Sequence, residues 1–137
     1  MVQGDGADVL DAREPGSVAA VTAFHVVEHL PLAGQLRLMV AAYRALAPGG
    51  VLIMETPNPE NVLVGAWTFY MDPTHLRPMP PSLLRFLIEA SSFEVVDVRR
   101  LHPDDAIVGR ARREGWPAGL VEILGAPRDY AIVARRP

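Results

Sequence analysis

Apolar residues are grouped along the chain in a pattern that predicts strands alternating with helices. The runs VAAVTAF at 18–24 and VLIME at 51–55 are apolar on both faces, which is typical of parallel strands covered by helices on each side. FEVVDVRR at 93–100 and DYAIVARR at 129–136 predict a third and a fourth strand. The chain therefore contains enough strands for a single open sheet.

Helices are predicted between these strands. A helix from about 33 to 47 is ended by the proline and glycines of 48–50, and a second helix at 80–91 is entered through proline. Residues 62–79 are irregular, and 102–127 are charged and broken by proline, which favours one or two short helices. The apolar stripe expected to pack the first helix on the sheet comprises Leu36, Met39, Val40, Tyr43 and Leu46.

The order strand, loop, helix, tight turn, strand is a βαβ unit, which is right-handed and has parallel strands. The predicted fold class is therefore α/β, with an open and mostly parallel sheet. In such sheets, ligands bind outside the carboxyl ends of the strands. The polar segments FHVVEH at 24–29 and ETPNPEN at 55–61 directly follow two of those ends, so they are expected to meet at a site.

Composition narrows the classes of function. The length of 137 residues suggests one domain, and the absence of cysteine excludes disulfides, thiolate nucleophiles and cysteine-based zinc sites. The net charge of -3 gives no general attraction to nucleic acid or to an anionic membrane. The polar, acidic start does not resemble a secretion signal, and no apolar run approaches the ~18 residues of a membrane span. A cytoplasmic protein with no nucleic-acid or membrane partner is expected.

The segment HVVEHL carries the strongest chemical signal. His25, Glu28 and His29 are spaced so that one helical turn would bring them to the same side, and His75 in the loop DPTHLRP could lie over them. A histidine with an ordinary pKa suits proton removal, which makes His29 and His75 candidate catalytic bases. The same residues could instead bind a divalent metal, or could simply hold the loops together.

Together, several segments resemble the class I S-adenosylmethionine-dependent methyltransferases. They are the acidic turn GDG at 4–6, FHVVEHL, LAPGGVLIMETPNPEN and DPTHLRP, and DYAIVARRP resembles the final antiparallel strand of that fold. The resemblance covers about residues 4–100 and is greatest to bacterial enzymes that methylate sugars, lipids or small molecules. It implies a partial Rossmann-like methyltransferase fold at 1–137, with 102–127 as a variable helical insertion. The chain resembles the C-terminal two-thirds of the family domain, without its glycine-rich cofactor turn.

The resemblance implies S-adenosylmethionine as the cofactor and assigns several residues to it. Asp5 would bind the adenine amino group, with Gly6, Phe24 and His25 beside it. Asp5 could equally be an ordinary turn aspartate, and Phe24 a core aromatic residue. Small-RNA 2′-O-methyltransferases and ubiquinone-pathway O-methyltransferases carry a similar cluster that binds a divalent ion. The matching positions here are His25, Glu28, His29 and His75, with His25 standing where those families have glutamate.

The acceptor implied by the resemblance is a small molecule, lipid or glycan that is methylated on oxygen. Asn58 could position its hydroxyl, Trp67 and Tyr70 could wall a pocket, and Arg77 could pair with an anionic acceptor. The alternatives are a turn-forming asparagine, core aromatic residues and an ion pair between Arg77 and Asp72.

Two other functions remain open from the sequence. The chain could be a non-catalytic methyltransferase fold that acts as an interaction module, or a metal-dependent hydrolase that uses the histidine and glutamate cluster. In a partial domain, the strand at 18–24 would also lose its usual neighbour. It is then expected to become an exposed edge through which copies of the chain associate as a homo-oligomer.

Overall fold

All four predicted strands are present in the computed structural model, which describes residues 3–137, and they form one sheet in the order β1-β2-β4-β3. The strands are β1 (Val18–Phe24), β2 (Leu46–Pro57), β3 (Glu94–Leu101) and β4 (Asp129–Arg135). The α-helices are α1 (Gly6–Asp11), α2 (Leu32–Ala45), α3 (Val62–Ala66), α4 (Pro81–Ala90), α5 (Asp105–Glu114) and α6 (Ala118–Leu124). Two 3-10 turns are η1 (Val27–His29) and η2 (Thr68–Met71).

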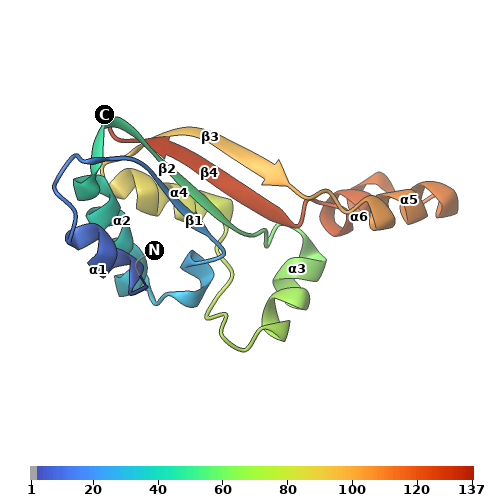
Figure 1. Cartoon of the computed structure of the whole chain (residues 1–137). Coiled ribbons are helices and arrows are strands. Elements are labelled where there is room, and N and C mark those ends of the chain that lie inside the picture. The colour runs from blue at the N-terminus through green and yellow to red at the C-terminus, as the bar shows by residue number, and fades with distance from the viewer. Residues whose placement is uncertain (1–2) are drawn as a thin grey trace.

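Strand directions agree with the predicted sheet. β1 and β2 are parallel, and β4 runs antiparallel to β2 on one side and to β3 on the other. β1, β2 and β3 therefore point the same way, and the last strand of the sequence lies between two of them. The predicted α/β class, with a mostly parallel sheet and a final antiparallel strand, is confirmed. The short helices α5 and α6 fill the segment 102–127 and project past one end of the sheet (Figure 1).

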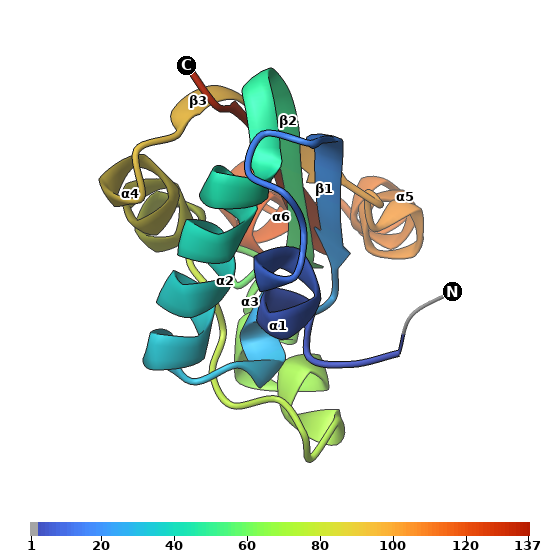
Figure 2. The ribbon, with the colours of Figure 1, turned by 60° about the vertical axis from the view of Figure 1, so that its left-hand side comes forward.

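Helices cover one face of the sheet. Figures 1 and 2 both place α1, α2 and α4 on the same side of the strands. Ala20, Thr22 and Phe24 are exposed on β1, whereas Ala23 between them is buried. The prediction that helices cover β1 on both sides is therefore wrong. Alanine and threonine are compatible with either a buried or an open face, so an uncharged run does not show how many faces are covered.

The packing face of α2 agrees with the predicted stripe only in part. Met39 and Leu46 are fully buried and Tyr43 packs against the core, whereas Leu36 and Val40 are exposed. The buried residues of the helix also include small alanines, which the stripe left out and which let a helix approach its neighbours closely; the full set is Gln35, Leu38, Met39, Ala41, Ala42 and Ala45. The core that results joins α2 and α4 to the inner strands through Met39, Leu52, Met54, Leu84, Ile88, Tyr130 and Ile132.

The two edges of the sheet differ in charge. β3 carries Glu94, Asp97, Arg99 and Arg100, whereas β1 has no charged residue. Charged residues on an edge strand discourage pairing with other chains. β1 thus has the features of an edge that pairs with another strand.

We propose that copies of this chain associate through β1. Thr22→Lys, in the middle of that strand, should shift the chain from a dimer or larger assembly to a monomer in size-exclusion chromatography, because it places a charge on the edge. Val96→Lys on β3, a position that is 60% exposed, is the matched control and should leave the assembly unchanged. A wild-type chain that elutes as a monomer at all concentrations would contradict the proposal.

Membrane-spanning structure is absent from the helices of residues 3–137. The longest of them, α2, has 14 residues, and none combines the length and apolar character needed to cross a bilayer.

Candidate functional site

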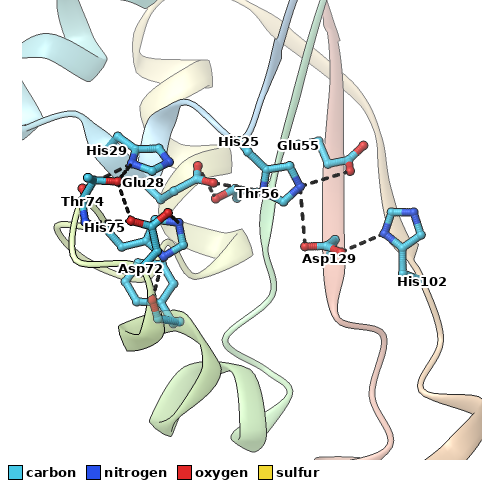
Figure 3. Close-up of polar contacts among 11 residues, drawn as sticks. His25, Glu28, His29, Glu55, Thr56, Asp72, Thr74, His75, His102 and Asp129 are labelled. Carbon is cyan, nitrogen blue, oxygen red and sulfur yellow. Dashed lines mark hydrogen bonds and ion pairs between the residues drawn. The ribbon is translucent and has the colours of Figure 1, made fainter.

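All four histidines of the chain lie in one row along the rim where β1, β2 and β3 end, with His102 directly after β3 (Figure 3). The carboxylates in the same row belong to Glu28, Glu55, Asp72 and Asp129. The parallel strands end at this rim, and the antiparallel strand β4 begins there with Asp129. The topology therefore gathers side chains from five separate segments of the sequence at one edge of the sheet.

Glu28 is the buried centre of this row. It lies in η1, is 0% exposed, and accepts a hydrogen bond on Oε2 from the hydroxyl of Thr56, at 2.9 Å. Its other oxygen, Oε1, lies 3.2 Å from Nδ1 of His25. The backbone carbonyl of Glu28 also accepts the N–H of Leu76, at 2.9 Å, which ties the loop that carries His75 to the end of β1. A buried carboxylate needs such partners, because an unpaired buried charge is strongly destabilising.

His75 is held in one tautomer by the backbone. Its Nδ1 lies 2.7 Å from the carbonyl oxygen of Phe69, which can only accept, so Nδ1 carries the hydrogen. The neutral ring then has its lone pair on Nε2. The Phe69 ring packs 4.4 Å from the imidazole, centroid to centroid, and fixes its plane. His75 thus presents an unprotonated nitrogen from a rigid position.

His29 is oriented by a chain of hydrogen bonds through Thr74. The Thr74 hydroxyl donates to Oδ1 of Asp72, at 2.6 Å, so it can only accept from Nδ1 of His29, at 2.9 Å. The Thr74 carbonyl, 3.2 Å from the same nitrogen, is a second acceptor. Nδ1 therefore carries the hydrogen, and Nε2 holds the lone pair. The hydrogen bonds from the Thr74 hydroxyl and backbone N–H lower the pKa of Asp72.

The two imidazoles meet beside the buried carboxylate. The rings of His29 and His75 are 4.7 Å apart, and one ligand atom from each of Glu28, His29 and His75 lies within 4.8 Å of the others. One carboxylate and two imidazoles, with the outer nitrogen of each imidazole already bonded, form a donor set that fits a divalent cation. Three of the four residues of the predicted cluster, Glu28, His29 and His75, therefore lie together, and metal binding by them stays a prediction.

His25 is the exception in the predicted metal cluster. Its φ of 51° turns the chain sharply at the end of β1. Nδ1 then faces Glu28, while Nε2 points away from His29 toward Glu55, at 3.7 Å, and Asp129, at 4.0 Å. His25 therefore links the cluster to the far end of the row, where Asp129 Oδ2 lies 2.8 Å from Nδ1 of His102.

Two of the residues predicted to bind the cofactor, Asp5 and Gly6, lie at the start of α1. Asp5 caps α1, and its Oδ1 accepts the N–H groups of Ala7 and Asp8. Among residues 3–137, its Oδ2 has no hydrogen-bond partner. Asp5 and Gly6 line a hollow of about 90 Å³, and Gly6 also lines a second hollow, of about 290 Å³, beside β1. These hollows meet at Gly6.

Phe24 and His25 lie at the end of β1. The side chain of Phe24 is 54% exposed, so the alternative of a core aromatic residue is wrong for it. An exposed aromatic ring at the end of a parallel strand is free to contact a ligand, and contact of Phe24 with the cofactor stays a prediction.

The residues predicted to contact the acceptor separate into two groups. Asn58 is fully buried: its amide donates to the carbonyl of Pro127, at 2.9 Å, and accepts the N–H of Glu60, so the structure favours the turn-forming alternative. Trp67 and Tyr70 are each 62% exposed, whereas Phe69 between them is buried.

Arg77 does not pair with Asp72 as one alternative expected. It is exposed, and no carboxylate of residues 3–137 lies within ion-pairing distance of it. Asp72 instead bonds Thr74 and lies 3.8 Å from Nε2 of His75.

Sequence reasoning missed the hydroxyls and one carboxylate of the site. No role in the site is assigned to Thr56 or Thr74 from the sequence. Asp129 could have been found, since the first residue of an antiparallel strand lies where its parallel neighbours end. The hydroxyls gave no such signal, because threonine occurs throughout strands and loops.

Comparisons with known proteins agree with the geometry. Residues 3–98 match the family model described as a methyltransferase domain. A probable S-adenosylmethionine-dependent methyltransferase of Mycolicibacterium smegmatis is 37% identical over 124 residues, which are 86% of this chain and 46% of that protein. The chain therefore spans less than half of this relative.

Solved structures show the same fold. The crystal structure of a SAM-dependent methyltransferase from Archaeoglobus fulgidus superposes with a TM-score of 0.84 at 28% identity, over 98% of this chain and 66% of that one. A methyltransferase from Mesorhizobium loti, at 19% identity and a TM-score of 0.62, covers 93% of this chain and 67% of its own. The chain belongs to the class I S-adenosylmethionine-dependent methyltransferase family.

Proposed function

We propose that the protein takes part in methyl transfer from S-adenosylmethionine to an oxygen of a small molecule, with His75 and His29 as candidate bases. The observation that carries this is that each ring is held through Nδ1, which leaves Nε2 as the nitrogen that can receive a proton from an acceptor. The donor, when bound, supplies a methyl group on a sulfonium sulfur that leaves as a neutral thioether. What the chain must supply is a position for the acceptor and a destination for its proton.

Nε2 of His75 is the proposed destination of the acceptor's proton. The Phe69 carbonyl stabilises the imidazolium that forms, because it still accepts from Nδ1 after Nε2 is protonated. Asp72, 3.8 Å from Nε2, adds a negative charge whose attraction grows as the ring becomes positive. Thr74 holds Nδ1 of His29, so that the His29 ring lies beside the His75 ring with its own Nε2 free.

Calorimetric titration with S-adenosylhomocysteine is the first test of this function. Binding in the micromolar range supports methyl transfer, and it should be followed by detection of methylated product with panels of phenols, sugars and lipids. No binding at millimolar ligand would contradict the proposal and support the non-catalytic interaction module. Because the chain spans less than half of its curated relative, a longer form of the protein should be titrated in parallel where one exists.

The hollow beside Asp5 fits one end of the donor. Val26 and Leu38 give it apolar walls, and Asp5 Oδ2 has a free lone pair that could accept from an amino group. We propose that the adenine ring lies there.

Asp5→Ser separates this role from helix capping, since serine is also a good N-cap. The free energy of unfolding should change by no more than about 0.5 kcal/mol. The affinity for S-adenosylhomocysteine should fall about three- to tenfold, the value of one lost hydrogen bond. Asp5→Ala is the control that loses both roles. Equal affinity in Asp5→Ser and wild type would show that Asp5 only caps α1.

The same methyl transfer could instead be assisted by a divalent cation held by Glu28, His29 and His75. Bound there, it would lower the pKa of the acceptor hydroxyl in place of a free base. Metal analysis of the purified chain, and activity before and after chelation, distinguish the two versions. Activity that survives chelation supports the metal-free base, and activity that is restored only by added cation supports the metal.

A further inference from the structure

The turn that carries Glu28 and His29 is short and weakly held by its own backbone. η1 has three residues, and its backbone hydrogen bonds, donated by the N–H groups of His29 and Leu30, are 3.1 and 3.3 Å long. A 3-10 turn has poorer hydrogen-bond geometry than an α-helix. The positions of the two site residues therefore depend on contacts from outside the turn.

One buried side chain of α2 holds both ends of this turn. Gln35 is fully buried, and its Nε2 donates to the carbonyl of Val27, at 2.8 Å, and to the carbonyl of Leu30, at 3.1 Å. Glu28 and His29, which Figure 3 shows side by side at the rim, are the two residues between those carbonyls. These two hydrogen bonds, the Gln35 bridge, thus span the pair that the site uses.

The orientation of the amide follows from its partners. A side-chain amide nitrogen has two hydrogens, and both of them have a carbonyl oxygen as acceptor. A third neighbour, Sδ of Met79 at 3.5 Å, is a weak acceptor. The reverse orientation would bring Oε1 against the same carbonyl oxygens, which cannot donate. Gln35 therefore acts on η1 through its N–H groups.

The other end of the same amide is unsatisfied. Oε1 of Gln35 is buried and has no hydrogen-bond partner among residues 3–137. A buried oxygen without a donor is destabilising by an amount comparable to the stabilisation from one hydrogen bond. A methionine would fill the same place without that penalty if packing alone mattered. The amide is thus better suited to holding the turn than to stabilising the core.

The Gln35 bridge connects the turn to the packed part of the fold. Gln35 lies near the start of α2, whose buried face joins the core through Met39 and Ala42. Met79, which contacts the amide, accepts on its backbone oxygen the hydroxyl of Tyr130 of β4, at 2.8 Å. The turn is therefore held against a helix and an inner strand, and close packing leaves both little freedom to shift.

We propose that Gln35 is a positioning residue, whose amide holds η1 so that Glu28 and His29 face His75. The inference rests on the proposed function, since it concerns the same pair of imidazoles. Without the Gln35 bridge, η1 would loosen. The His29 ring would then lose its place 4.7 Å from the His75 ring and its hydrogen bond to Thr74.

NMR spectra of the histidine rings test the inference without requiring turnover. Gln35→Met keeps the length of the side chain and removes both donors. In the whole chain, this variant should lose the nuclear Overhauser effect between the His29 and His75 rings. The hydrogen on Nδ1 of His29 should also give way to an average over both ring nitrogens.

Ala42→Gly is the matched control for Gln35→Met. It weakens the same helix further along, where the side chain is a single methyl group, so it lowers stability without removing the Gln35 bridge. It should keep both His29 signals. Loss of the signals in Gln35→Met alone supports the inference. A folded Gln35→Met variant that keeps both signals overturns it, and so does equal loss in the two variants.

Hydrogen exchange in the wild type gives a second test, which does not depend on whether the variant folds. The chain has two glutamines, and Gln3 is exposed. The side-chain amide hydrogens of Gln35 should exchange at least roughly tenfold more slowly than those of Gln3, because both are buried and bonded. Equal exchange rates would overturn the inference.

The rate of methyl transfer and the titration with S-adenosylhomocysteine keep the inference apart from the proposed function. The rate constant should fall roughly ten- to hundredfold in Gln35→Met, the usual effect of removing a group that orients a site residue. In Ala42→Gly it should stay close to that of the wild type. If the wild type did not bind S-adenosylhomocysteine, while Gln35→Met still lost the His29 signals, the proposed function would be wrong and the Gln35 bridge would be supported.

Discussion

Replacement of His75 by asparagine is expected to lower the rate of methyl transfer by about 10²- to 10⁴-fold, the usual contribution of a general base. The asparagine amide nitrogen stands close to the position of Nδ1 and can still donate to the Phe69 carbonyl, so the loop should keep its place. What disappears is Nε2, the proposed proton acceptor. The rate constant for transfer should fall, while the affinity for S-adenosylhomocysteine should stay within about twofold of wild type.

His102→Asn is the matched control for this prediction. His102 belongs to the same row of rim residues, but it lies at the far end, is exposed, and has a φ of 55°, which asparagine tolerates. It should retain nearly full activity. Equal losses of activity in both variants would mean that the rim residues act together through their summed charge. His75 would then have no special role as a base. If His75→Asn kept full activity, the proposed base would be wrong.

Ile132→Ala is expected to have the largest effect on stability, at about 2–5 kcal/mol in the free energy of unfolding. Ile132 is fully buried at the centre of β4, where it pairs with Met54 of β2 and Val98 of β3. Truncation leaves a cavity between the sheet and the helices that pack on it, and the close packing of this core leaves little freedom to close the cavity. Urea denaturation followed by circular dichroism measures the change.

Val96→Ala on β3 is the control for Ile132→Ala. Its side chain is 60% exposed, so truncation should cost less than about 0.5 kcal/mol. Similar small losses in both variants would mean that β4 is not an inner strand. A large loss for Ile132→Ala alone supports the order of the sheet.

The sequence predicted the strands well because each is a short apolar run bounded by turn residues. It also indicated that Glu28, His29 and His75 could lie together, since two of them share a helical turn and the loop DPTHLRP could bring the third over them. It did not predict the departure of His25, because that depends on one backbone angle. Residue type alone does not indicate a positive φ at a histidine.

The errors on β1 and α2 have a common physical origin. Alanine and threonine pack equally well against a helix or beside water, so the apolar run of β1 did not show that one of its faces is open. In α2, the predicted stripe correctly included Met39, but it also included the exposed Leu36 and Val40 and left out the buried alanines. Close approach between a helix and a sheet is controlled by the smallest side chains, which hydrophobic periodicity weights least.

The position of β4 has a consequence for how these residues fold during synthesis. β4 is the last of the four strands along the sequence, yet it lies in the interior of the sheet, and β3 pairs with no other described strand. Until residue 135 has left the ribosome, β3 has no partner in register, and β2 exposes the side that β4 will later fill. Native pairing across the sheet must therefore wait until translation has passed that residue, and termination of translation before β4 should yield chains that are degraded or aggregate rather than shortened folded ones.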